Sequence, residues 1–240
     1  MISVSKTALI TGAGRGIGRA IAIMLAKQGI HLALAGRDKK ALDETIAMVK
    51  EYGVEAIEIL ADNDVEETPK FLIKSVIEKY NRLDILINNA GYAINKSFEQ
   101  HTINDWNAVM ICNARAPFFI TQEALPYLKK SGKGMIINIS SAVGRLGYAD
   151  QSAYTASKHA LMGWTKALAK EVQKDNIRVH VIAPGGVATE MISKMRPDIN
   201  PAELMQVEEI ADIVKFLISF EGNAMIDEIN VRRFSSSPWQ

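Results

Sequence analysis

The sequence contains little cysteine and no grouped histidines. Its 240 residues include one cysteine, Cys112, and four histidines, none at the spacing of metal ligands, so no structural metal site is expected. A single cysteine cannot form an intrachain disulfide, which is compatible with the reducing cytoplasm where we expect the protein to act. Because no histidine lies near it in the sequence, we interpret Cys112 as a small buried residue and not as a nucleophile.

An excess of one charge and a long apolar run are also missing. The sequence has 28 Lys and Arg residues against 27 Asp and Glu residues, a net charge of +1, so neither nucleic acid nor a membrane surface is expected as a partner. No apolar run approaches the roughly 18 residues of a membrane-spanning helix. The hydrophobic content of 48% and the charged content of 23% are ordinary for a soluble globular protein.

Short apolar segments alternate with segments of helical periodicity along the whole chain. This alternation predicts an α/β fold, a Rossmann-like doubly wound parallel sheet of about seven strands with helices on both faces. Residues 1–240 are expected to form one domain, with a flexible tail at 235–240. The predicted strands are 6–11, 32–35, 56–60, 84–88, 134–140, 178–183 and 227–231, and the predicted helices are 16–28, 38–52, 65–80, 105–130, 152–174 and 207–220.

A glycine-rich stretch follows the first predicted strand and precedes the first predicted helix. Glycines at this junction let the backbone approach a pyrophosphate, whose charge is stabilised at the N-terminus of the helix. Ordinary turn glycines are the alternative, but the order strand, loop, helix favours nucleotide binding. The residues assigned to this loop are Gly12, Gly14, Arg15, Gly16, Ile17 and Gly18.

Three residues in the stretch 141–158 form a candidate acid–base group. Tyr154 and Lys158 are four residues apart and therefore share one face of the predicted helix. An ammonium group beside a phenol favours the phenolate, lowers the phenol pKa and makes it a better catalyst near neutral pH. Ser141 precedes a loop that can bring its hydroxyl over the start of this helix. An amphipathic surface pair is the alternative interpretation of the Tyr and Lys.

Together with other motifs, these stretches resemble the short-chain dehydrogenase/reductase family. The matching motifs are T-G-x-x-x-G-x-G at 11–18, N-N-A-G at 88–91, Asn113, Ser141 with Tyr154-x-x-x-Lys158, and P-G-x-V-x-T at 184–189. The resemblance covers residues 6 to about 231. Within the family, the chain resembles members that are like the 3-oxoacyl-carrier-protein reductases.

The resemblance implies an oxidoreductase that interconverts a carbonyl compound and an alcohol by hydride transfer. Tyr154 would act as general acid and base, and Lys158 would lower its pKa and hold the nicotinamide ribose. Ser141 would bind the substrate oxygen, and Asn113 would hold a water that extends the proton relay. Besides the glycine loop, Tyr154 and Lys158, the implied cofactor contacts are Asp62, Asn63, Asn89, Ala90, Gly91, Pro184, Gly185, Val187 and Thr189. For Asp62, capping of the helix 65–80 is the alternative.

The end of the second predicted strand indicates which cofactor is bound. NAD-binding versions of this fold place an acidic residue there for the ribose 2′-hydroxyl. Here Gly36 holds that position and Arg37 follows, so a guanidinium is present where a 2′-phosphate would lie. We therefore expect NADP(H) and consider NAD(H) less favoured. Asp38 is interpreted as the N-cap of the next helix.

The substrate and the partners are less well defined by the sequence. The Met-containing segment 190–206 is expected to cover a small carbonyl or alcohol substrate, and the family resemblance implies a homotetramer, with a dimer as the alternative. A 3-oxoacyl reductase is an alternative activity, in which Lys129, Lys130 and Lys133 would meet an acidic carrier protein. However, the C-terminal residues 227–234 differ from that branch of the family. An NADP(H)-sensing regulator without turnover is the alternative from another functional class.

Overall fold

The structure, a computed structural model, describes residues 5–62 and 65–238; Asn63, one of the expected cofactor contacts, lies outside them. It contains a seven-stranded sheet in the order β3-β2-β1-β4-β5-β6-β7, and every adjacent pair is parallel. The predicted fold class is therefore confirmed. The strands are β1 (Thr7–Thr11), β2 (His31–Gly36), β3 (Ala56–Leu60), β4 (Ile85–Asn88), β5 (Met135–Ile139), β6 (Arg178–Pro184) and β7 (Glu228–Val231).

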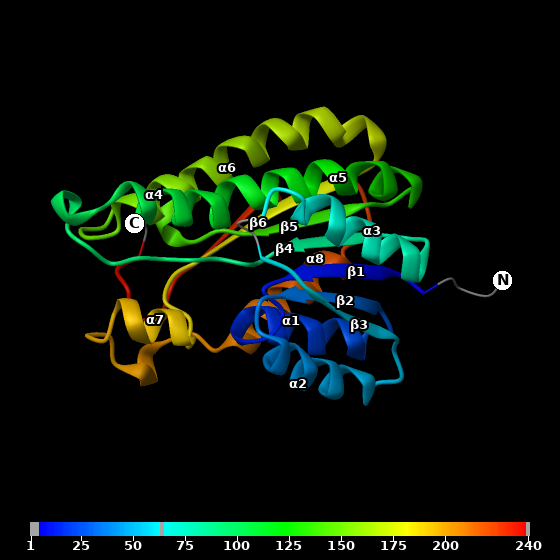
Figure 1. Ribbon diagram of the computed structural model, residues 1–240, viewed down its shortest axis with the longest axis horizontal. Coiled ribbons are helices and arrows are strands. Elements are labelled where there is room, and N and C mark those ends of the chain that lie inside the picture. The colour runs from blue at the N-terminus through cyan, green and yellow to red at the C-terminus, as the bar shows by residue number, and fades with distance from the viewer. Residues whose placement is uncertain (1–4, 63–64, 239–240) are drawn as a thin grey trace.

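Helices cover both faces of this sheet (Figure 1). They are α1 (Gly16–Lys27), α2 (Lys39–Lys50), α3 (Thr68–Tyr80), α4 (Ile103–Met110), α5 (Ala116–Lys130), α6 (Ser152–Val172), α7 (Glu190–Met195) and α8 (Val207–Ser219). Within the described residues, none of these helices is long and apolar enough to cross a membrane.

The alternation of side chains along each strand explains the two layers. In β1, Ile10 packs into a core shared with α1, α2 and α8, whereas its neighbour Leu9 packs into a second core shared with α3, α5 and α6. Both side chains are fully buried. Because strands buried on both faces need apolar residues at every position, they appear in the sequence as short continuous apolar runs.

The predicted helix 105–130 is divided. The structure has α4, then a π-helical segment, Ile111–Arg115, and then α5. Proline at 117 offers one physical reason, since it has no N–H to donate to the carbonyl of Asn113, four residues earlier. The prediction of a helix over 105–130 is nevertheless confirmed, since the three segments follow one another without a break and the π-helical turn lies just before Pro117. Helix α7 is a short helix that the sequence did not predict.

The strand order reverses at the contact between β1 and β4. The Thr11 hydroxyl accepts hydrogen bonds from the backbone N–H groups of Asn89 and Ala90, both at 3.1 Å. The Asn89 amide donates to the carbonyls of Thr11 and Gly12 at 3.0 and 3.1 Å. Gly12 has a φ of +66°, and a Cβ there would lie 2.9 Å from Ala90 Cα, so only glycine fits.

The C-terminal end of the described chain folds back beside the end of β6. The Arg232 guanidinium donates to the carbonyls of Arg233, Phe234 and Ser236 at 3.1, 3.1 and 2.8 Å. The Ser235 hydroxyl donates to Glu203 at 2.9 Å. Flexibility of the whole tail 235–240 stays a prediction.

The hydroxyl of Thr11 should be essential for the contact between β1 and β4. Thr11→Val removes the acceptor of two backbone N–H groups, and we expect the free energy of unfolding to fall by about 2–4 kcal/mol. Urea denaturation measures this loss. Thr11→Ser keeps the hydroxyl and should recover most of the stability. Equal losses in both variants would mean that packing, and not the hydrogen bonds, holds this contact.

Candidate active site

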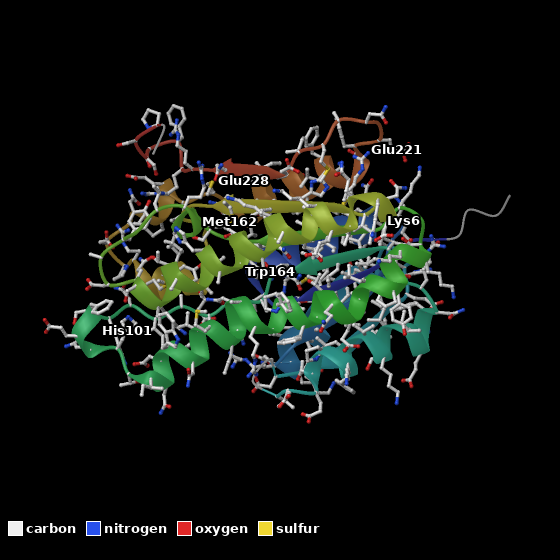
Figure 2. The ribbon with its side chains drawn as sticks, turned by 90° about the horizontal axis from the view of Figure 1, so that it is seen from above. Lys6, His101, Met162, Trp164, Glu221 and Glu228 are labelled. Carbon is white, nitrogen blue, oxygen red and sulfur yellow. The ribbon has the colours of Figure 1, made fainter. Side chains whose placement is uncertain are left out.

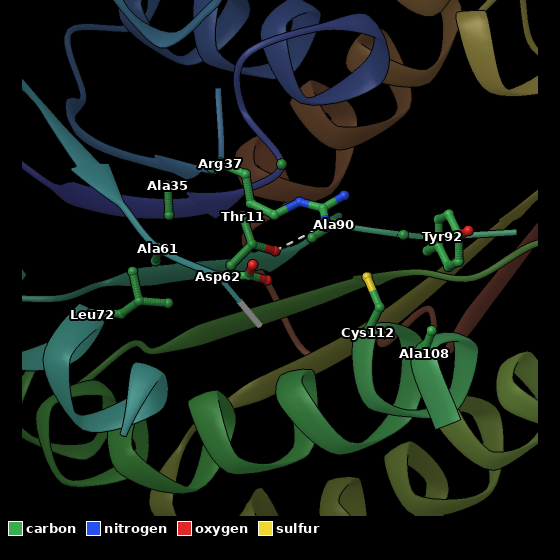
Figure 3. Close-up of a pocket in the computed structure, with 13 residues that line it drawn as sticks. Thr11, Ala35, Arg37, Ala61, Asp62, Leu72, Ala90, Tyr92, Ala108 and Cys112 are labelled. Atoms are coloured by element: carbon green, nitrogen blue, oxygen red, sulfur yellow. Dashed lines mark hydrogen bonds between the residues drawn. The ribbon is translucent and has the colours of Figure 1, made fainter. Parts of the chain in front are cut away.

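A cavity of about 370 Å³ lies at the carboxyl ends of the first four strands. Ligands of open parallel sheets bind at this edge, where the strand order reverses. Figure 3 shows Arg37, Asp62, Ala90 and Cys112 around the cavity. Its lining comes from the ends of β1, β2 and β3, from the loop after β4, and from α3, α4 and the π-helical segment; the residues are Thr11, Gly12, Ala35, Gly36, Arg37, Ala61, Asp62, Leu72, Ala90, Gly91, Tyr92, Ala108 and Cys112.

The glycine loop leaves the start of α1 open to an anion. The N-cap residue Arg15 makes no side-chain capping hydrogen bond, so no side chain satisfies the first N–H groups of α1 at this position. The loop is also tightly packed. A Cβ on Gly18 would lie 2.2 Å from the Gly12 carbonyl oxygen, and one on Gly14 would lie 3.0 Å from the Ala41 Cβ. Ile17 is half-buried and packs on the core. These features fit a bound pyrophosphate.

Arg15 is held by two carboxylates from different parts of the chain. Its guanidinium pairs with Asp38, the N-cap of α2, and donates to Glu190, the first residue of α7, at 3.1 Å. Gly16 lies next to the same region, since its Cβ would lie 3.2 Å from Thr189 Cγ2. The predicted cap role of Asp38 is confirmed by its bond from Ala41 N at 3.1 Å. Arg15 is thus already paired where the sequence suggested a phosphate ligand.

Arg37 is the guanidinium that lines the cavity. It is exposed, follows the end of β2, and makes no hydrogen bond or ion pair to residues 5–62 or 65–238. Asp62 lines the same cavity, and its backbone carbonyl accepts the Thr68 hydroxyl at 2.6 Å. The Asp62 side chain does not cap α3, whose N-cap is Glu67. Asp62 is therefore a residue of the cavity wall and not the cap of α3.

Helix α6 brings the candidate acid–base residues together. Tyr154 and Lys158 are buried on it, with 9% and 3% of their surfaces exposed. Lys158 Nζ lies 5.9 Å from the centroid of the Tyr154 ring and donates to the Ile139 carbonyl, at the end of β5, at 2.9 Å. Ser141, two residues beyond β5, lies close enough to the Tyr154 side chain to lower its pKa. The three residues predicted from the sequence are thus assembled at one place.

Burial changes the acidity of this pair in a direction that the sequence did not predict. Burial raises the pKa of Tyr154 above its ordinary value of 10.0, and the nearby Ser141 hydroxyl only partly opposes this. Burial also lowers the pKa of Lys158 to about 8. The expectation that Lys158 lowers the Tyr154 pKa stays a prediction, because the net rise reflects removal of the phenol from water and does not isolate the effect of Lys158.

The side chain of Asn113 joins the loop after β4 to helix α6, which carries Tyr154 and Lys158. Its side-chain oxygen accepts from Tyr92 N at 2.8 Å, and its amide donates to Tyr92 O at 2.7 Å and to Ser157 Oγ at 3.0 Å. Ser157 in turn donates to the Tyr154 carbonyl at 2.7 Å. Sequence reasoning missed Ser157, although a serine inside a helix commonly bonds to a carbonyl three or four residues earlier.

Gly91 lies where these groups converge. A Cβ on it would lie 3.6 Å from Asn113 Oδ1, 3.8 Å from Lys158 Nζ and 3.8 Å from Met191 Cε. A side chain on Gly91 would therefore crowd both Lys158 and Met191 of α7.

Cys112 lines the cavity and is half-buried, so its interpretation as a buried residue is only partly correct.

The motif P-G-x-V-x-T at 184–189, which the resemblance assigned to cofactor binding, lies at the end of β6, outside the lining of the cavity. Gly185 N donates to the Val231 carbonyl at 2.7 Å, which joins the motif to β7. Thr189 caps α7 by accepting from Ile192 N at 3.4 Å. Pro184 and Val187 are buried. The motif thus positions α7, whose Met191 lies beside Gly91, as Lys158 does.

Comparison with known proteins agrees with this geometry. The family model described as short chain dehydrogenase matches residues 6–200. An uncharacterized oxidoreductase of Thermotoga maritima is 35% identical over 202 residues, which cover 84% of this chain and 80% of that protein. The 3-oxoacyl-acyl-carrier-protein reductase FabG of the same organism is 32% identical over 232 residues, or 93% of this chain and 94% of the relative.

Solved structures show the same architecture. An alcohol dehydrogenase from the archaeon Thermococcus sibiricus, complexed with 5-hydroxy-NADP, superposes with a TM-score of 0.91 at 26% identity, covering 98% of this chain and 100% of the other. A metagenomic short-chain oxidoreductase in complex with NADP gives a TM-score of 0.84 at 32% identity, with coverage of 98% and 100%.

Lys158 should make the stability of the protein depend on pH. Its pKa is about 8 in the folded protein against an ordinary 10.5, so between these values the unfolded chain binds more protons. The contribution of Lys158 to the free energy of unfolding therefore rises with pH in this range. From pH 7 to 9.5, urea denaturation should show the parent gaining about 1–2 kcal/mol relative to Lys158→Met.

The control for this measurement is Lys166→Met, which removes an exposed lysine from the same helix. Its stability should follow that of the parent at every pH. If Lys158→Met also follows the parent, the Lys158 pKa is not lowered.

Proposed function

The chain belongs to the short-chain dehydrogenase family, and on that premise we propose that it is an NADP(H)-dependent oxidoreductase. It interconverts a ketone or aldehyde and the corresponding alcohol. The observation that carries this proposal is the proximity of Ser141, Tyr154 and Lys158, with Lys158 beside Gly91, a residue that also lines the cavity. The bound nicotinamide supplies the hydride chemistry, while the protein orients the reactants and moves the proton.

Tyr154 gives its hydroxyl proton to the carbonyl oxygen during reduction and takes a proton back during alcohol oxidation. The raised pKa keeps the hydroxyl protonated at neutral pH, which suits the acid role. Ser141 holds the same oxygen through its hydroxyl. Lys158, with a pKa of about 8, is mostly a cation at pH 7, and it holds the ribose and stabilises the phenolate that forms when the proton leaves.

Asn113 contributes through its main chain in this proposal. Its side chain already bonds to Tyr92 and Ser157, which fixes the loop above the site. Its carbonyl has no N–H partner at Pro117, and this acceptor is the group that holds the relay water.

The preference for NADP(H) rests on Arg37. Its guanidinium lines the cavity, and Gly36 leaves no carboxylate at the end of β2 to repel a 2′-phosphate. Arg15 is a second ligand only after it leaves Asp38 or Glu190. Two similar solved structures, one complexed with 5-hydroxy-NADP and one with NADP, also support NADP(H) as the cofactor.

A 3-oxoacyl-carrier-protein reductase is the second candidate, because a protein of that name is similar over 93% of this chain. The position of the candidate docking lysines argues against it. Lys129 pairs with Asp175 beyond the C-terminus of α6, whereas Tyr154 lies near its N-terminus. Eighteen residues of helix separate Tyr154 from Val172, or about 27 Å. A carrier bound at these lysines would deliver its acyl group to the wrong end of the sheet.

A regulator without turnover has less support, since Tyr154 and Lys158 are both present and assembled. The protein is proposed to act in the cytoplasm.

The proposed homotetramer rests on an aromatic surface of α5 and α6. Phe118 and Phe119 are 43% and 44% exposed, and Phe118 contacts Trp164 edge-on at 5.8 Å between ring centroids. Trp164, labelled in Figure 2, has a buried ring nitrogen without an acceptor among the described residues. We expect light scattering at micromolar concentration to give the mass of four chains, and a stable monomer would refute this.

Removal of the Tyr154 hydroxyl tests the proton transfer. Tyr154→Phe should lower kcat by about 10²–10⁴-fold, the usual contribution of a general acid, and leave NADPH binding within a few-fold of the parent. Steady-state rates at the nicotinamide absorbance band and fluorescence titration measure the two effects. Tyr127→Phe removes a phenolic hydroxyl from α5, away from the site, and should leave the rate unchanged. Turnover close to the parent rate in Tyr154→Phe would refute the mechanism.

Arg37→Asp tests the cofactor assignment. The carboxylate repels a 2′-phosphate and accepts a ribose 2′-hydroxyl, so the ratio of kcat/KM for NADPH to that for NADH should fall by at least about 30-fold. Lys40→Asp makes the same charge change at an exposed residue of α2 and is the control. A parent enzyme that already prefers NADH would contradict the assignment.

A further inference from the structure

An apolar cluster surrounds the catalytic tyrosine. Tyr154 packs with the buried side chains of Val109, Val143, Ala153 and Met195, and Ala93, Ile94 and Met191 pack on this group while half-buried. We call the seven residues of this group other than Tyr154 the apolar cap. None of them carries a charge or a hydrogen-bonding side chain. A carbonyl group that reaches the Tyr154 hydroxyl therefore has its substituents against aliphatic and thioether groups.

The arginines in the segments that flank the cap are already neutralised. Arg145, directly after the turn Ala142–Gly144, pairs with Glu228 at 3.3 Å. Arg196, directly after α7, pairs with Asp198 at 2.7 Å. Each of these two guanidinium groups therefore pairs with a carboxylate of the protein. A substrate anion would have to displace that carboxylate in order to bind the arginine.

Two further arginines follow β7. Arg233 pairs with Glu203 at 3.4 Å and lies beside Gly186, whose Cβ would be 3.3 Å from Arg233 Cδ. Arg232 donates to three carbonyls of its own turn. Lys158 lies near Tyr154, but it donates to the Ile139 carbonyl and, under the proposed function, to the cofactor ribose. These cations are thus already engaged.

The side of the cap formed by α7 is the adaptable one. Met195 is 7% exposed, and Met191 Cε approaches the Gly91 backbone beside Lys158. Methionine side chains have several rotatable bonds and fill irregular apolar space. An apolar substituent can replace the methionine contacts with similar ones, whereas a carboxylate would be buried without a partner, at a large cost in free energy.

We propose that the substrate is an uncharged ketone or secondary alcohol with apolar substituents beside the reacting carbon, and that Met191 and Met195 set this preference. The proposal rests on the oxidoreductase function proposed above and narrows its substrate class. Oxo acids and other substrates with an anionic group next to the carbonyl are poor substrates.

A matched pair of compounds tests the substrate class. Ethyl 3-oxobutanoate and 3-oxobutanoate share the 3-oxobutanoyl skeleton. The acid carries a negative charge one methylene from the ketone, where the ester carries an uncharged ethoxycarbonyl group. With saturating NADPH, the kcat/KM of the ester should exceed that of the carboxylate by at least about 100-fold. Equal or better use of the carboxylate would overturn this inference and leave the oxidoreductase function intact. Failure to reduce any ketone in a panel, while NADPH still binds by fluorescence, would overturn both.

Substitution of the cap tests which residues set the preference. Met195→Lys places an ammonium in the cap and should shift the ester-to-acid ratio toward the acid by at least about 10-fold. Met195→Gln, of similar length but without charge, is the matched control and should shift it much less. Met191→Lys, at a half-buried position, provides the same test if Met195→Lys does not fold. Equal shifts in the Lys and Gln variants would show that charge exclusion by the methionines is not the cause.

Discussion

The close contact between β1 and β4 is the constraint on which the rest of the site depends. The strand order reverses there, and the loops that leave the two strands form the walls of the cavity. The hydroxyl of Thr11 and the amide of Asn89 bind the opposite backbone with four hydrogen bonds of 3.0–3.1 Å. Only glycine fits at 12 and 18, because the loop, the strand and the helix meet there at van der Waals distance.

The site combines two halves of the chain with different tasks. The ends of the strands before residue 91 line the cavity, while β5, α6 and the π-helical segment Ile111–Arg115 position the candidate acid–base residues. Asn113 joins the halves, since its side chain binds the backbone of Tyr92 on one side and Ser157 on the other. Helix α6 and the loop after β4 are therefore joined by one buried amide.

Local patterns in the sequence predicted the sheet, the glycine loop and the positions of Tyr154 and Lys158, because each depends on residues that are close along the chain. The features that the sequence did not predict depend on distant partners. The ion pair between Arg15 and Glu190 joins residues 175 positions apart. The raised pKa of Tyr154 depends on its burial in the folded protein, which the spacing of Tyr154 and Lys158 along one helix does not reveal. The π-helical segment lies just before Pro117, which has no N–H to continue the α-helical hydrogen-bond pattern, and the helical periodicity of the sequence does not reveal it.

The guanidinium of Arg15 is a movable link between the cofactor loop and α7. It bonds to both Asp38 and Glu190, yet its side chain is 59% exposed, so water and ions reach both pairs. Salt at physiological concentration screens exposed charges beyond roughly 8 Å and weakens such contacts. Higher ionic strength in the surrounding solution therefore weakens this one contact between the two segments.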